Sequence, residues 1–116
     1  MSIPEPHPAF PNYFITQVDD MPIKGQTGDW RTKYGEKRIT VAEGMSIDHC
    51  LATAIHEMVE QRLCEKRGIK EIDVDCYDMR DGDPYKRECP YRKEHVAAMK
   101  VERAVCKVLG IAPLPE

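Results

Sequence analysis

Residues 56–60, with the sequence His-Glu-Met-Val-Glu, combine side chains that can bind a metal ion and move a proton. Side chains at positions i and i+4 of a helix lie on one face about 6 Å apart, so His56 and Glu60 can contact the same ion. One nitrogen and one oxygen ligand suit zinc. Glu57 projects about 100° round the helix, beside the ion, where a carboxylate can take a proton from metal-bound water. The spacing predicts a metal site with Glu57 as the general base.

The pair Glu94-His95 supplies the candidates for a third ligand. We favour His95 because neutral imidazole suits zinc, and Glu94 is the alternative. Glu102 lies two helical turns beyond His95 on roughly the same face, so we expect it to contact the metal-binding side chains without binding the ion itself. The small side chains of Ala97 and Ala98 would let two helices approach closely. The prediction is therefore a Zn²⁺ ion held by two histidines and one glutamate from two helices.

Each of these segments also has an interpretation without chemistry. Residues 56–60 could form a solvated helix face, and the pair 94–95 could be a first turn that satisfies the helix dipole. Five aspartates between residues 73 and 83 lack the spacing of a calcium loop and indicate a solvated turn. Trp30 and Cys89 are expected to be buried core residues.

The residues around the first segment predict one long amphipathic helix over 47–67. Ser46 is a favourable N-cap, and Gly68 supplies a left-handed cap after two basic residues in the last turn. Apolar residues recur at helical spacing and are expected to face the core. They are Leu51, Ile55, Met58, Val59 and Leu63.

A second helix is predicted to begin after Pro90 and to end at Gly110. Its expected apolar stripe consists of Val96, Ala97, Val101, Ala104, Val105, Val108 and Leu109. Residues 69–89 fit either a short helix or an extended segment, and residues 81–84 form a turn in both cases.

The first part of the chain has the character of strands. Residues 13–18 are aromatic and β-branched, and residues 19–29 form a polar loop. Two runs of alternating residues, 30–34 and 38–42, flank a turn at 35–37 and predict a β-hairpin. The expected fold class is therefore α+β, with a small antiparallel β-sheet of two to three strands packed on two main helices. The Pro-rich residues 1–12 are expected to form an extended arm, and residues 13–116 a single domain.

Composition narrows the class of protein further. The net charge is −3 with both signs interleaved, so no basic stripe indicates a nucleic-acid partner. No apolar run approaches the ~20 residues of a membrane span, and the first residues do not have the pattern of a signal peptide. Five cysteines match no disulfide framework, which favours reduced thiols in a cytoplasmic protein.

A strand over 38–42, a capped helix with the motif His-Glu-x-x-Glu, and a later helix with a metal-binding residue together resemble the minimal plan of the zincin metallopeptidases. Zincins usually have a second histidine where this chain has Glu60. Two histidines and one carboxylate would still form a catalytic zinc ligand set. If Glu94 replaced His95, a second carboxylate would nearly neutralise the ion and weaken the polarisation of its water.

A second resemblance covers residues 28–110 and is to small uncharacterised proteins of tailed phages and prophages. It rests on Gly28-Asp29-Trp30, Ala54 through Glu60, Asp75-Cys76-Tyr77-Asp78, and Tyr91 through His95 with Glu102-Arg103. This resemblance implies a phage or prophage origin and a place in the cytoplasm of a bacterial host, and it implies no particular reaction.

Three functions follow as hypotheses. The first is a zinc-dependent hydrolase of minimal zincin type that acts on a protein or peptide. The second is a non-catalytic phage accessory protein that binds a partner on the same scaffold. The third is an all-helical nucleotide pyrophosphohydrolase, in which four glutamates (Glu57, Glu60, Glu94 and Glu102) would hold Mg²⁺; the strand-rich first part of the chain speaks against it.

Overall fold

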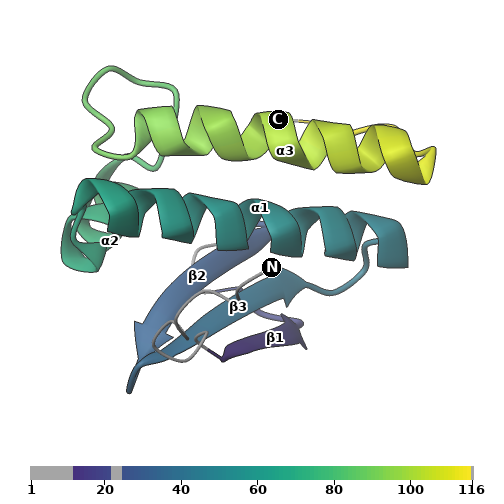
Figure 1. Ribbon diagram of the computed structural model, residues 1–116, viewed down its shortest axis with the longest axis horizontal. Coiled ribbons are helices and arrows are strands. Elements are labelled where there is room, and N and C mark those ends of the chain that lie inside the picture. Colours follow the sequence, from purple (N-terminus) through teal and green to yellow (C-terminus); the bar gives the residue numbers. More distant parts are fainter. Residues whose placement is uncertain (1–11, 22–24, 116) are drawn as a thin grey trace, which may run out of the picture.

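Three strands precede three helices along the chain (Figure 1). A computed structural model describes residues 12–21 and 25–115, so the predicted arm over 1–12 lies almost wholly outside the described residues. The strands are β1 (Tyr13–Val18), β2 (Gly28–Lys33) and β3 (Glu36–Ala42). The helices are α1 (Ile47–Arg67), α2 (Glu71–Arg80) and α3 (Arg92–Leu109). The α+β class is confirmed, with α2 as a third helix in the segment that the sequence left open.

The predicted hairpin is present as β2 and β3, which pair in antiparallel fashion. Its turn is formed by Tyr34 and Gly35, whose φ angles are 52° and 76°. Positive φ at both central positions is the pattern of a type I′ two-residue turn, so the turn precedes the predicted 35–37 and Tyr34 leaves the strand. The polar loop also ends earlier than predicted, because Gly28 and Asp29 already belong to β2.

The prediction of a purely antiparallel sheet is wrong. The strand order is β1-β3-β2, and β1 runs parallel to β3 with Tyr13 opposite Lys37 and Val18 opposite Ala42. Parallel neighbours need a crossover connection. Here β2 comes between β1 and β3 in the sequence but lies on the far side of β3 and runs antiparallel to it, so β3 returns alongside β1 in the same direction.

Helix α1 has the predicted bounds. The Ser46 side chain accepts a hydrogen bond from the backbone N–H of His49 at 3.1 Å, which caps the first turn. At the other end Gly68 has φ 73°, and its N–H donates to the carbonyl groups of Cys64 and Glu65. The capping residues alone therefore predicted both ends of the helix that carries the candidate site.

The predicted inward face of α1 is only partly correct: Met58 packs against the core, but the side chains with the lowest exposure are small or polar. They are Ala52, Thr53, Ala54, His56, Glu57, Glu60, Gln61 and Cys64, whereas Leu51 is 47% exposed. Figure 1 shows the reason: α1 lies between the sheet and α3 and is covered on two sides. Small residues allow that close approach, and among the polar ones His56 contacts Glu60 while Gln61 donates a hydrogen bond to Thr32 of β2.

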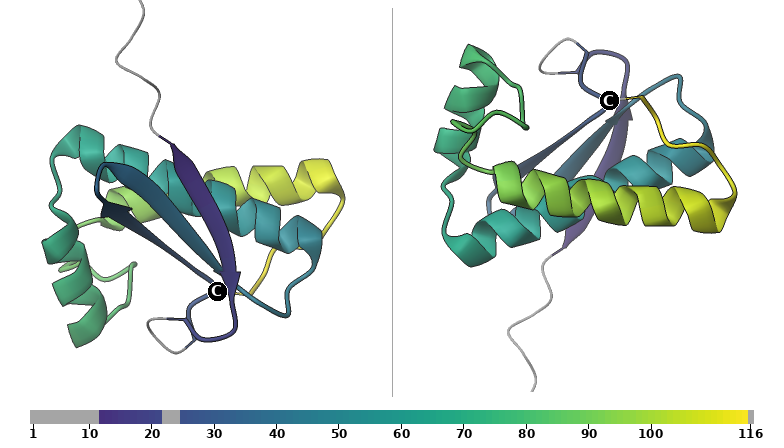
Figure 2. Two further views of the ribbon diagram at one scale, coloured as in Figure 1. Left: turned by 90° about the horizontal axis from the view of Figure 1, so that it is seen from below. Right: turned by 90° about the horizontal axis from the view of Figure 1, so that it is seen from above.

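Helix α3 departs from its predicted stripe in the same way. Its buried residues are Glu94, Ala98, Met99, Glu102 and Cys106, and Val108 is 86% exposed. The views in Figure 2 show α3 running across α1 on the side away from the sheet. Ala98 is fully buried there, which agrees with the expected close approach of the two helices.

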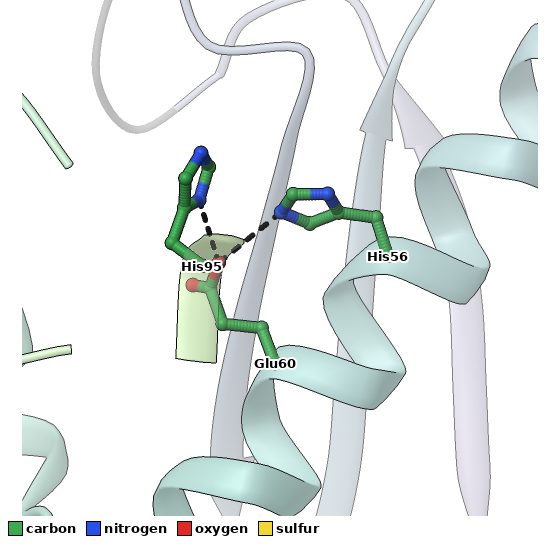
Figure 3. Close-up of side chains that lie close together, drawn as sticks. All are labelled: His56, Glu60 and His95. Carbon is green, nitrogen blue, oxygen red and sulfur yellow. Dashed lines mark hydrogen bonds and ion pairs between the residues drawn. The ribbon is translucent and has the colours of Figure 1, made fainter. Parts of the chain in front are cut away.

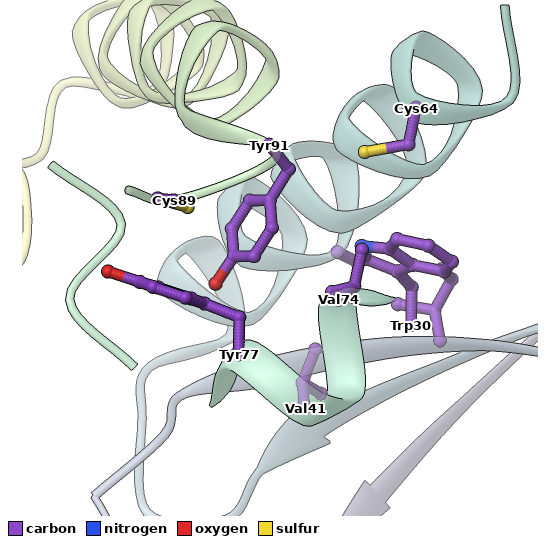
Figure 4. Packing of buried hydrophobic residues seen from close by; sticks show 9 residues of the cluster. Trp30, Val41, Cys64, Val74, Tyr77, Cys89 and Tyr91 are labelled. Atoms are coloured by element: carbon purple, nitrogen blue, oxygen red, sulfur yellow. The ribbon is translucent and has the colours of Figure 1, made fainter. Parts of the chain in front are cut away.

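The hydrophobic core lies between the sheet, α1 and α2 (Figure 4). Trp30 and Cys89 are both 6% exposed, as predicted for core residues. Val74 and Tyr77 attach α2 to this core, and all five cysteines are free thiols. In the described part of the chain, no helix has both the length and the apolar character to cross a bilayer.

Candidate metal centre

Three of the predicted residues meet where α1 and α3 face each other (Figure 3). Glu60 Oε2 lies 3.1 Å from His56 Nε2 and 2.9 Å from His95 Nδ1. The three possible ligand atoms all lie within 4.8 Å of one another, and His56 and Glu60 are buried while His95 is half-buried. Residues 35 positions apart in the sequence therefore present two nitrogens and one oxygen to one small volume.

The strand β2 contributes a contact that the sequence did not indicate. The indole N–H of Trp30 donates a hydrogen bond to Oε1 of Glu60 at 3.1 Å. Burial raises the pKa of Glu60, but the hydrogen bonds from His56 and His95 outweigh burial and lower this pKa to about 2. Glu60 is therefore an ionised carboxylate with both oxygens in use. Trp30 was predicted as a core residue, and nothing in the neighbouring sequence indicated that its indole N–H would also donate a hydrogen bond to Glu60.

Glu102 lies on the other side of the His56 ring, as predicted. Its Oε1 is 3.1 Å from His56 Nδ1, an ion-pair contact whose angle falls outside hydrogen-bond geometry. Burial lowers the pKa of His56, but the contacts with Glu102 and Glu60 raise it to about 10. The imidazole is therefore held between two carboxylates, an arrangement that orients a metal-binding histidine and strengthens it as a ligand.

Glu57 lies beside the cluster, and one of its carboxylate oxygens accepts no hydrogen bond from the described residues. The residue is 7% exposed, and Oε2 has no hydrogen-bond partner among the described residues. This oxygen is 3.8 Å from His56 Nε2. Burial and the nearby Glu60 raise the pKa of Glu57 well above its usual value. An unpaired buried carboxylate next to possible metal ligands is the arrangement expected of a group that exchanges a proton.

The alternative third ligand, Glu94, is bound elsewhere. Its two oxygens accept hydrogen bonds from Arg67 Nε at 2.8 Å and from another guanidinium nitrogen of Arg67 at 2.6 Å. Arg67 also donates to the carbonyl oxygen of Pro90 at 2.7 Å. The structure therefore places Glu94 in a clamp between α1 and the start of α3, and places His95 in the cluster.

The cluster opens into a pocket of about 750 Å³, within the usual size range of small-molecule and peptide sites. Seven carboxylate side chains line it, and among the described lining residues there is no lysine or arginine. The seven are Asp29, Glu57, Glu60, Asp78, Asp81, Asp83 and Glu102. The pocket is therefore suited to a cation.

Asp78, Tyr85 and Tyr91 also line the pocket, and the sequence did not single them out for this site. Burial raises the pKa of Asp78 to about 6, although Asp78 accepts a hydrogen bond from the Tyr91 hydroxyl. The Tyr85 ring packs edge-on against the His95 ring, with centroids 5.2 Å apart. The run of aspartates was interpreted as a solvated turn, and only the folded chain brings Asp78 to the pocket.

The donor set fits zinc better than magnesium. Two imidazole nitrogens and one carboxylate oxygen are common ligands of catalytic zinc, whereas Mg²⁺ prefers oxygen ligands alone. Glu57 lines the same pocket and its Oε2 accepts no hydrogen bond from the described residues, so a cation there would also satisfy this buried oxygen. A comparison of the chain with protein-family models, curated proteins and solved structures found no match.

Proposed function

We propose that this chain is a zinc-dependent hydrolase that cleaves a peptide or amide bond. His56, Glu60 and His95 would hold the ion, and Glu57 would act as the general base. The observation that carries this proposal is the convergence of these three ligand atoms within 4.8 Å beside the unpaired carboxylate of Glu57. The resemblance to phage and prophage proteins supports a place for this activity in the cytoplasm of a bacterial host.

The residues of the chain would divide the reaction between them. Zinc in such a site polarises the substrate carbonyl and lowers the pKa of its bound water. Glu57 would accept a proton from the attacking water and pass the same proton to the leaving amine nitrogen. Glu102 would orient His56, and the burial that raises the pKa of Glu57 would favour its acceptance of a proton.

Metal content and single substitutions test the proposal. Protein purified without a histidine tag is expected to contain one zinc ion per chain, measured by elemental mass spectrometry. His56→Ala should lose the metal, whereas Glu57→Gln should keep it and lose hydrolysis of a peptide library analysed by mass spectrometry. Loss of one general base typically lowers the rate ~10²–10⁴-fold. Equal hydrolysis by Glu57→Gln and the wild type would exclude the enzymatic mechanism.

The second candidate is a non-catalytic phage accessory protein that binds a protein partner. Phe14 and Ile15 favour it, because they are 43% and 54% exposed on β1, a strand at the edge of the sheet. Zinc binding without hydrolysis by either the wild type or Glu57→Gln would support this function.

The pyrophosphohydrolase hypothesis loses its basis. It required an all-helical fold, and the chain has a three-stranded sheet. It also required Glu94 as a magnesium ligand, and Arg67 occupies both oxygens of that carboxylate.

A further inference from the structure

We infer that Trp30 is a positioning residue, which holds one oxygen of Glu60 so that this glutamate offers a metal ion a single oxygen. The inference rests on the proposed zinc site and adds a residue from the sheet to it. It also assigns Trp30 a part in metal selectivity, beyond its place in the core.

The hydrogen bonds of Glu60 carry this inference. Oε1 accepts the indole N–H of Trp30 at 3.1 Å, while Oε2 is the atom that faces both imidazole rings. Figure 3 shows the dashed contacts from both rings converging on one oxygen of Glu60. Trp30 is 6% exposed and Glu60 5% exposed, so water does not compete for this bond.

The packing of Trp30 makes the direction of the indole N–H rigid. Trp30 belongs to the core cluster with Cys64 and Val74, which Figure 4 shows around its ring. The residue lies in β2 opposite Ile39 of β3, so the ladder sets its backbone position. The donor is therefore held before any ion arrives, and Glu60 cannot turn both oxygens toward the cluster without breaking this bond.

A one-oxygen carboxylate has a chemical consequence. With two imidazole nitrogens it makes three ligand atoms and leaves a fourth position for water, which is the arrangement of catalytic zinc. Ions that prefer more oxygen ligands, such as Mn²⁺ and Ca²⁺, gain from a carboxylate that binds through both oxygens. By occupying Oε1, Trp30 should favour zinc over these ions.

Replacing the indole N–H without changing the shape of the ring tests the inference. Trp30 is the only tryptophan of the chain, so replacing tryptophan by benzothienylalanine during expression changes this position alone. Benzothienylalanine has sulfur in place of the indole N–H. We expect zinc affinity, measured by chelator competition, to fall ~10–100-fold, as for other groups that orient ligands. Manganese affinity should change less, so the ratio of zinc affinity to manganese affinity should fall. Trp30→Phe should act in the same direction.

Tyr77→Phe is the matched control, since Tyr77 is another buried core aromatic and its hydroxyl donates to the Asp83 carbonyl instead of to Glu60. It should leave both affinities unchanged. The chain has a single indole N–H resonance, that of Trp30. Relative to the wild type, this resonance should shift in Glu60→Gln and stay in place in Glu94→Gln. The dispersed backbone amide resonances in the same spectra show whether each variant is folded, which separates a loss of the contact from a loss of folding.

The outcomes separate the two proposals. If the wild type binds zinc and the variant without the N–H binds zinc and manganese with unchanged affinities, the inference about Trp30 is wrong and the proposed function stands. If the wild type binds neither ion, the proposed function fails and the inference fails with it.

Discussion

Four glutamates of α1 and α3 are buried, and their neighbours give them different chemistry. Two imidazoles stabilise the charge of Glu60, and its pKa falls to about 2. Burial raises the pKa of Glu57, which has an unpaired oxygen. Glu94 is bound by Arg67, and Glu102 contacts the far side of His56. In the proposed site, one residue type would therefore supply a ligand, a base and an orienting group beside the helix clamp of Glu94, because the partners differ.

A single glycine, Gly28, lets β2 lie close to Glu57. A Cβ atom at Gly28 would lie 2.7 Å from Cγ2 of Thr53 and 2.9 Å from Cγ of Glu57, both closer than carbon atoms tolerate. We expect Gly28→Ala to lower the free energy of unfolding in urea by ~1–3 kcal/mol, the usual cost of overpacking.

The steric origin of this loss has its own control. Thr53→Ser removes Cγ2 and keeps the hydroxyl, so the double variant Gly28→Ala/Thr53→Ser should recover part of the lost stability. Gly28→Ala with wild-type stability would show that the contact between β2 and α1 is looser than described.

At the scale of elements, α1 and α3 are joined by a buried carboxylate and a half-exposed cation. The Glu94 side chain is 7% exposed and the Arg67 side chain 48%. Arg67→Ala should lower the melting temperature, followed by circular dichroism, because it leaves a buried charge without its partner. Arg62→Ala is the matched control: Arg62 pairs with Glu65 on the same helix, and both side chains are exposed. It should have little effect. Equal losses in the two variants would argue against the clamp.

At the scale of the whole molecule, the proposed metal connects the two long helices, with the sheet attached through Trp30. Zinc should therefore raise the melting temperature of the entire domain, with a stabilisation of about 2.7 kcal/mol at a free zinc concentration 100 times Kd. His95→Ala should remove this response.

The size of that response should depend on pH. In the metal-free protein His56 has a pKa of about 10, raised above its ordinary 6.5, so the ring is protonated at neutral pH. A zinc ligand must be neutral, so binding has to release about one proton from this ring, and zinc affinity should rise between pH 6 and pH 8. Calorimetry in buffers of different ionisation enthalpy measures the protons released. Binding without proton release would contradict the assignment of His56 as a ligand.

The amino-acid sequence determined the features that depend on neighbouring residues. Ser46 and Gly68 predicted the ends of α1, helical spacing predicted that His56 and Glu60 share a face, and alternation predicted the hairpin. Each of these is a property of a few consecutive residues, because caps, helical periodicity and strand alternation act over short distances.

Only the tertiary structure decided which segments meet. It brought His95 to Glu60 and paired Glu94 with Arg67, although the two candidates are adjacent in the sequence. It also set Trp30 against Glu60 and placed β1 parallel to β3. The inward faces of α1 and α3 could not be predicted from hydrophobicity, because a buried polar group costs little once it has a partner. The partners His95 and Trp30 of Glu60 come from distant parts of the chain.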